Sequence, residues 1–115
     1  MILEIRTYRL RPGTRDEFVR LMRNVAVPLL TDAGIDTVRC GPSLVDEDGN
    51  EEAYLIRAFT DLQAHEAQET AFYGSDAWRS GPRDAIIGCI ESYHSITIEA
   101  TATAIDALRS GVSLL

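Results

Sequence analysis

The order in which strand and helix patterns follow one another is the feature that most constrains the fold of this chain. Residues 2–10 alternate in side-chain character, which predicts a β-strand. From Phe18 to Leu29, apolar residues recur at spacings of three and four, which predicts an amphipathic helix. We expect this helix to be kinked at Pro28 and to end at Gly34.

The rest of the chain adds three strands and further helices. We expect strands over residues 35–44 and 53–60, joined by an acidic turn, and a last strand over residues 92–100. Helices are expected over residues 62–73 and 83–90, with a short helical segment between them. The order β-α-β-β-α-(α)-β predicts an α+β fold of the ferredoxin-like, split βαβ type, with a four-stranded antiparallel sheet covered by helices on one face.

A single domain is expected, because 115 residues is an ordinary domain length. Residues 1–100 would form the ferredoxin-like domain. Residues 101–115 would be a C-terminal tail of the same domain, with a short helix over residues 102–108 that ends near Gly111.

The alternation in the first strand divides its residues between two faces. We expect Leu3 and Ile5 to face the helices, which would leave Glu4, Arg6 and Tyr8 on the opposite face. The last strand would add alternate residues to that opposite face: Tyr93, Ser95 and Thr97. A face that is half apolar and half charged can meet solvent or the same face of a second subunit, and its apolar residues favour a homodimer.

Charge and composition exclude several classes of function. The chain has 11 basic and 18 acidic residues, which gives a net charge of −7. Every basic residue is Arg, so chemistry that needs a lysine Schiff base, such as that of pyridoxal phosphate enzymes, is excluded. A net negative chain repels phosphate, so we expect no nucleic-acid partner.

Membranes and the common cofactors are also not expected. The longest apolar stretch is far shorter than the roughly 20 residues that cross a bilayer, and no signal-peptide pattern is present, so we expect a cytoplasmic protein without a membrane partner. Dinucleotide, P-loop and hydrolase glycine motifs do not occur. Cys40 and Cys89 are expected to be reduced, and two isolated histidines predict neither a metal site nor a haem ligand, so no cofactor is expected.

Two segments resemble a known family. Arg6-Thr7-Tyr8-Arg9-Leu10-Arg11-Pro12-Gly13, followed by a helix, resembles the opening of the NIPSNAP family. The segment from Phe72 to Arg83, with Glu91-Ser92-Tyr93-His94 after it, resembles the closing part of the same family. The resemblance covers residues 1 to about 100.

The resemblance implies a dimeric α+β barrel, in which two ferredoxin-like sheets close against each other. The same superfamily contains cofactor-free monooxygenases of polyketide biosynthesis, muconolactone isomerase-like enzymes and haem-degrading proteins. Most NIPSNAP-like proteins have no assigned reaction, so the resemblance predicts the architecture and leaves the activity open.

Tyr8 and Arg6 are the first candidate catalytic residues. A phenol beside a guanidinium can donate a hydrogen bond to a substrate oxygen, and the positive charge would lower the pKa of Tyr8. The alternative is that Tyr8 and Arg6 form a buried structural network with Glu4.

The two histidines are further candidates for proton transfer. His65 lies in the second long helix and can shuttle protons in a pocket between helix and sheet, or can be an exposed residue paired with Glu66 or Glu69. His94 alternates with the isoleucines of the last strand, so we expect it to point toward the helices as a site residue or a core histidine.

Aromatic residues near the second half of the chain are candidates for ligand binding. Phe72, Tyr73 and Trp78 lie within one short segment flanked by Gly74 and Gly81, and they form either a lid over an apolar pocket or a plug that closes the core. Tyr93 is the remaining ligand-binding candidate.

These observations lead to two functional hypotheses. The first is a homodimer that binds a small, partly apolar or aromatic molecule between sheet and helices, with cofactor-independent oxygenase or isomerase chemistry carried by the catalytic candidates. The second is a non-catalytic dimeric module that recruits a protein partner through its acidic surface.

Overall fold

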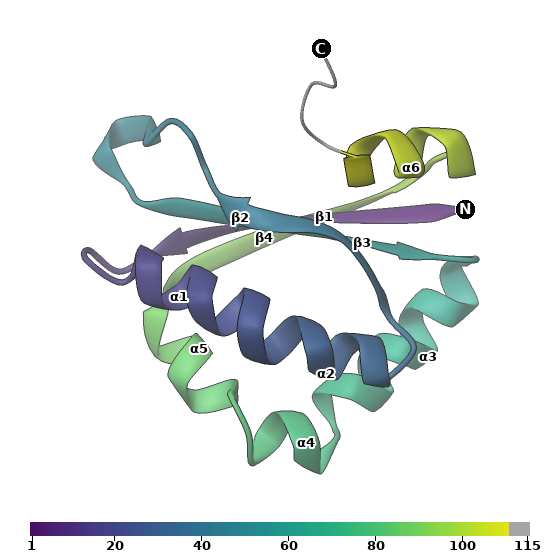
Figure 1. Ribbon diagram of the computed structural model, residues 1–115, viewed down its shortest axis with the longest axis horizontal. Helices are drawn as coiled ribbons and strands as arrows, with labels where there is room; N and C mark the ends of the chain where they lie inside the picture. Colours follow the sequence, from purple (N-terminus) through teal and green to yellow (C-terminus); the bar gives the residue numbers. More distant parts are fainter. Residues whose placement is uncertain (111–115) are drawn as a thin grey trace.

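One antiparallel sheet forms the centre of the protein (Figure 1). The computed structural model describes residues 1–110. Within this range the sheet has four strands in the order β2-β3-β1-β4. The strands are β1 (Ile2–Leu10), β2 (Asp36–Pro42), β3 (Glu52–Phe59) and β4 (Ile90–Glu99). This order and direction confirm the predicted ferredoxin-like α+β fold.

Helices cover both faces of the sheet unequally (Figure 1). One face, called the helix face below, carries the helices α1 (Arg15–Leu21), α2 (Val27–Asp32), α3 (Leu62–Tyr73), α4 (Asp76–Arg79) and α5 (Arg83–Cys89). The other face, called the open face, carries α6 (Ala102–Ser110). No helix of residues 1–110 is long and apolar enough to cross a membrane.

The helical path from α1 to α2 shows how the chain accommodates Pro28. A π-helical turn, η1 (Met22–Ala26), separates the two helices, and the Val27 amide donates to the Met22 carbonyl five residues back. Proline has no amide hydrogen, so it fits at the first turn of α2, where no intrahelical partner is needed. Where a kink at Pro28 was expected, the structure has a π-helical turn just before it.

The structure corrects the predicted assignment of strand faces. Ile2, Tyr8 and Leu10 are buried in the core under the helices, whereas Leu3 is buried on the open face. Glu4 and Arg6 alternate with Leu3 and Ile5, so they lie on the helix face, contrary to prediction. The prediction failed because α6 gives Leu3 an apolar cover of its own, and because the charged side chains find buried partners among the helices.

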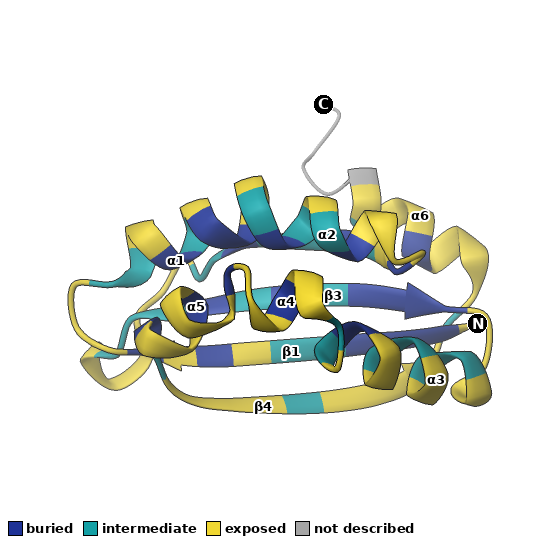
Figure 2. Ribbon diagram, turned by 90° about the horizontal axis from the view of Figure 1, so that it is seen from below, coloured by how far each residue is buried: buried dark blue, intermediate teal, exposed yellow. Residues whose placement is uncertain are grey.

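The same reversal holds along β4. Tyr93, Ser95 and Thr97 pair with Tyr8, Arg6 and Glu4, so all three lie on the helix face and not away from it. His94 pairs with Thr7 on the open face and is exposed, so the expectation that it points toward the helices is wrong. As an edge strand, β4 is exposed over most of its length (Figure 2).

Helix α6 packs on one end of the open face. Ile105 is 1 % exposed and lies in a small core with Leu3, Val38 and Ala58. Arg109 adds two hydrogen bonds of 2.7 and 2.9 Å to the carboxylate of Asp36. The helix predicted over residues 102–108 is present, and its expected end near Gly111 lies outside the described residues.

The packing of α6 makes a prediction about stability. Replacing Ile105 by Ala should lower the free energy of unfolding by about 2–5 kcal/mol, because it leaves a cavity against the open face. Urea unfolding measures this loss, and Thr103→Ala on the exposed side of α6 is the control. A loss no larger than that of the control would show that α6 does not pack on the sheet.

Candidate functional site

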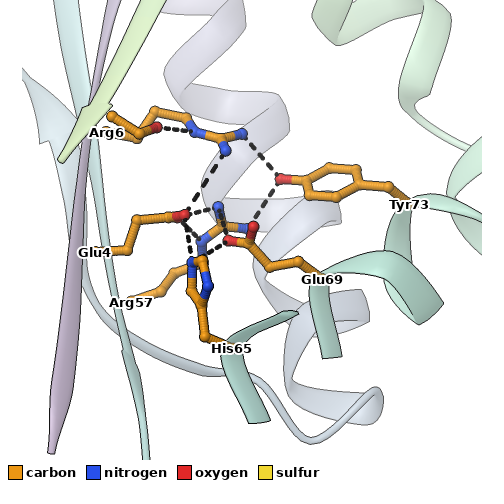
Figure 3. Close-up of polar contacts among 7 residues, drawn as sticks. Glu4, Arg6, Arg57, His65, Glu69 and Tyr73 are labelled. Carbon is orange, nitrogen blue, oxygen red and sulfur yellow. Dashed lines mark hydrogen bonds and ion pairs between the residues drawn. The ribbon is translucent and has the colours of Figure 1, made fainter. Parts of the chain in front are cut away.

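A cluster of charged side chains lies between the sheet and α3 (Figure 3). The charged cluster consists of Glu4, Arg6, Arg57, His65, Glu69 and Tyr73. Two strands and one helix supply these residues. Glu4 and Arg6 are two positions apart on β1, so they share a face, and Arg57 is the direct partner of Glu4 on β3. The three residues from α3 are spaced four apart, which places them on one side of that helix.

Arg57 is the centre of the cluster. Its side chain is fully buried, and a buried guanidinium needs opposite charges and hydrogen bonds around it. Arg57 Nε donates to Glu4 Oε1 at 2.9 Å, and Nη2 also contacts that oxygen. Arg57 Nη2 lies 2.7 Å from Glu69 Oε1, and Nη1 donates to the Tyr73 hydroxyl at 2.8 Å. This one side chain therefore ties β1, β3 and α3 together.

The pKa values of the two carboxyl groups of the cluster are shifted in opposite directions. Burial by itself would raise the pKa of Glu4, but its hydrogen bonds with Glu69 and His65 and the charge of Arg57 outweigh burial and lower that pKa to about 2. Burial raises the pKa of Glu69 to about 6, and the hydrogen bond with the ionised Glu4 adds to the shift. With these pKa values Glu4 is ionised at neutral pH, whereas Glu69 loses its proton near pH 6.

His65 is held in place by this pair. Its Nε2 lies 3.0 Å from Glu4 Oε2 and 3.5 Å from Glu69 Oε1, and its ring packs edge-on against Phe59. The side chain is partly buried, so the alternative of an exposed histidine on the helix surface does not hold. The pairing with Glu69 that this alternative included is present.

Arg6 connects the cluster to β4. Its Nε donates to the Ser95 hydroxyl at 2.8 Å, and its Nη1 donates to the Tyr73 hydroxyl at 3.2 Å. The guanidinium carbon also lies 4.8 Å from the centre of the Tyr93 ring, within the range of a cation–π contact. Arg6 is therefore oriented by two hydrogen bonds and by the rings of Tyr93 and Tyr73.

A pocket opens beside the charged cluster on the helix face. Its volume is about 330 Å³. Most of its wall is apolar and includes Met22, Leu30, Leu55, Phe72, Trp78 and Ile86. Its polar side chains are Arg6, Tyr8, Glu69, Tyr73, Arg83 and Tyr93. An apolar wall with a few polar groups is the usual composition of a small-molecule site.

Five of the seven predicted site residues line this pocket: Arg6, Tyr8, Phe72, Trp78 and Tyr93. His65 lies in the charged cluster without lining the pocket, and His94 is on the open face. Burial raises the pKa of Tyr8, and this effect outweighs the charge of Arg6 that was expected to lower it. Tyr8 is therefore a neutral phenol under ordinary conditions.

Phe72 and Trp78 belong to the core and also line the pocket. Both side chains are buried in the core, with ring centres 5.5 Å apart, and both line the pocket. Gly81 next to them has a steric role, because a Cβ there would lie 2.2 Å from the Ala77 carbonyl oxygen. This close backbone approach accounts for a glycine at this position.

Arg57 and the position of Glu69 in the pocket wall were not predicted from the sequence. The spacing of His65, Glu69 and Tyr73 along one side of a helix is a signal that indicates a polar stripe facing the sheet. No local pattern marks Arg57, because its partners come from β1 and α3. Only the pairing of β1 with β3 brings it to Glu4.

The acidic part of the cluster also has the donor atoms of a cation site. Glu4, His65 and Glu69 each offer an atom within 4.8 Å of the others. Arg57 contacts both carboxylates, so it already supplies the positive charge that such a group attracts. The donor set therefore fits an ion-pair network better than a metal centre.

The raised pKa of Glu69 makes a prediction about stability and pH. The folded state binds the Glu69 proton more tightly than the unfolded state, so protonated Glu69 contributes to the free energy of unfolding. This contribution is complete below about pH 4.5 and is lost as pH rises through about 6. A rise in pH across this range should lower the free energy of unfolding by roughly 2 kcal/mol through the ionisation of Glu69.

Glu69→Gln should abolish this loss, so the stability of the variant relative to wild type should rise with pH. Denaturant unfolding at acidic and neutral pH measures the change. Glu66→Gln, on an exposed position of α3, should show no such rise. An equal difference between Glu69→Gln and wild type at both pH values would contradict the prediction.

Comparisons with known proteins agree with this architecture. The chain is similar over 89 % of its length to an uncharacterized NIPSNAP domain protein from Burkholderia xenovorans, with 20 % identity, a TM-score of 0.76 and 96 % of that chain covered. A NIPSNAP family protein of unknown function from Agrobacterium tumefaciens has 21 % identity and a TM-score of 0.77, with 88 % of each chain covered. At these identities the structural similarity shows a shared fold.

The fold is also similar, at a lower TM-score, to a protein with a different description. A protein from Nitrosomonas europaea described as a candidate antibiotic biosynthesis monooxygenase has 18 % identity and a TM-score of 0.59, with 87 % of this chain and 98 % of that chain covered. A search of curated proteins finds no match to this chain.

The NIPSNAP family model matches residues 3–104. Because this match spans most of the sequence, the chain belongs to the NIPSNAP family.

Proposed function

We propose that this NIPSNAP protein binds a small, partly apolar molecule with an acidic head group in the pocket between the sheet and the helices. The observation that carries the proposal is the largely apolar pocket of about 330 Å³ with Arg6 and Glu69 among its lining residues. Its volume lies at the lower end of the usual range for small-molecule sites. The alternative of a non-catalytic interaction module is not favoured, because it requires no such pocket.

The polar residues that line the pocket suit cofactor-independent acid–base chemistry. Arg6 can hold a negatively charged oxygen, and Glu69 exchanges a proton near neutral pH, as a general acid or base must. Tyr8, Phe72 and Trp78 contribute to the wall. The fold similarity to the Nitrosomonas europaea protein supports an oxygenase or isomerase type of reaction by analogy only.

As part of this proposal, two copies associate through the open face. Ile56, Ile5 and Ile96 form a row across β3, β1 and β4 in the strand register, and Ile98 pairs with Leu3 beside it. Ile96 is 49 % exposed and Ile98 is 44 % exposed in the single chain. An apolar row of this kind on an uncovered sheet face supports association with a second sheet.

The proposed location is the cytoplasm. Cys40 and Cys89 are free thiols, and a reducing compartment keeps thiols in this state.

The pocket can be tested with small aryl acids. Phenylacetate, 3-phenylpropionate and cinnamate at millimolar concentration should raise the Tm by several degrees, because a ligand that binds only the folded state stabilises it. Ala26→Leu places extra carbon atoms in the pocket and should abolish the shift. Ala67→Leu, at an exposed position of α3, should leave it unchanged. If no acid in this panel raises the Tm, the proposed function fails.

The homodimer can be tested by light scattering. At micromolar concentration the wild-type mass should be twice that of the chain, and Ile96→Lys should give a monomer because a buried charge opposes association. Leu62→Lys, at an exposed apolar position of α3, should remain dimeric. A monomeric wild-type protein would overturn this part of the proposal.

A further inference from the structure

We propose that the pocket catalyses proton transfer at the carbon next to a carbonyl group in a small aryl-substituted keto acid, with Glu69 as the proton acceptor and Arg6 and Tyr73 as the groups that hold the carbonyl oxygen. This inference rests on the proposed function, because it assigns the chemistry of the molecule bound there.

Arg6 has donor hydrogens left for a ligand. Of its three nitrogens, Nε and one Nη make hydrogen bonds, to Ser95 and Tyr73. Nη2 lies 3.8 Å from Glu4 Oε2, which is longer than a hydrogen bond. A guanidinium has five donor hydrogens, so a ligand oxygen in the pocket can accept from Arg6 without displacing either existing bond.

Tyr73 is oriented as a donor by its neighbours. Its hydroxyl oxygen accepts hydrogen bonds from Arg57 Nη1 and Arg6 Nη1. A phenol that accepts two hydrogen bonds has its one hydrogen left to donate, and two cationic donors strengthen that donation. Tyr73 lines the pocket, so its hydrogen and the free Arg6 hydrogens together form a site for a developing oxyanion.

Glu69 lies on the same side of α3, one helical turn before Tyr73, and it also lines the pocket. Its pKa of about 6 lets it be unprotonated at neutral pH while remaining basic enough to accept a proton. The charged and titratable groups that face it are Glu4 and Arg6 from β1, Arg57 from β3, and His65 and Tyr73 from α3. Arg57 fixes its position at 2.7 Å, so the carboxyl group is held near the oxyanion site (Figure 3).

The reaction needs no oxidant or metal. A carbon–hydrogen bond next to the carbonyl breaks, and the proton passes to the Glu69 carboxylate. The electron pair of that bond forms a carbon–carbon double bond, and the carbonyl oxygen becomes an enolate oxygen that accepts from Arg6 and Tyr73. Return of a proton from Glu69 to carbon restores the ketone, and return to oxygen gives the enol.

The remaining pocket residues select the substrate class. Phe72, Trp78 and Ile86 offer an apolar wall for an aromatic ring. Arg83 lines the same pocket, and its contact with Asp84 is an exposed ion pair, which holds its partner weakly. A ligand carboxylate can therefore take Arg83 as its partner. A small molecule with a ring, a ketone and a carboxylate satisfies all three parts of the pocket.

Phenylpyruvate is the probe for this inference. Proton NMR in deuterated buffer measures the exchange of its CH₂ hydrogens for deuterium, after subtraction of the rate in buffer alone. Wild-type protein should accelerate the exchange, and Glu69→Gln should lower the acceleration on the order of a hundredfold, as expected for loss of a general base. Glu66→Gln, exposed on the same helix, should match wild type.

Two further readings separate catalysis from binding. Phenylpyruvate should raise the Tm of wild type and Glu69→Gln alike, and the wild-type exchange rate should increase as pH rises through about 6. Binding without accelerated exchange, or equal acceleration by Glu69→Gln, overturns the inference and leaves the proposed function standing. A failure of phenylpyruvate to bind overturns the inference as well, whereas the proposed function falls only if the aryl acid panel also fails.

Discussion

The fully buried guanidinium of Arg57 is the constraint on which the rest of the site depends. A charge in this position is tolerated only with opposite charges and hydrogen bonds around it. Glu4 from the neighbouring strand and Glu69 and Tyr73 from α3 supply them. Because Arg57 and these partners belong to three elements, β3, β1 and α3, neutralising one charge also fixes the distance between the sheet and α3. The short contacts of Arg57 thereby set one wall of the pocket.

The same constraint explains why the site can have unusual proton chemistry. Glu4 is the stronger acid of the pair and remains ionised beside Arg57, and its charge together with burial keeps the proton on Glu69 up to about pH 6. Two carboxyl groups with different environments thus have different roles, one structural and one titrating. The titrating group, Glu69, also lines the apolar pocket, so the ion-pair network is part of a candidate reaction site.

Individual elements show how much of the fold and of the candidate site could be predicted from the sequence. The helix over residues 62–73 was predicted with the bounds it has, because its composition and its flanking residues are local signals. The strand order followed from the sequence of patterns. The faces of β1 were predicted wrongly, because alternation separates Leu3 from Glu4 without saying which face a helix covers. Arg57 was not predicted, because its partners are distant from it in the sequence.

The sequence by itself determined the elements, their order and the membership of the NIPSNAP family, since periodicity, turn residues and short motifs are local properties of the chain. Only the tertiary structure decided which face of the sheet holds the charges, that His94 lies away from the pocket, and that Glu69 and Tyr73 stand beside Arg6. The physical reason is that burial and electrostatic pairing depend on which elements meet, and here the strand pairing and the placement of α3 and α6 decide that.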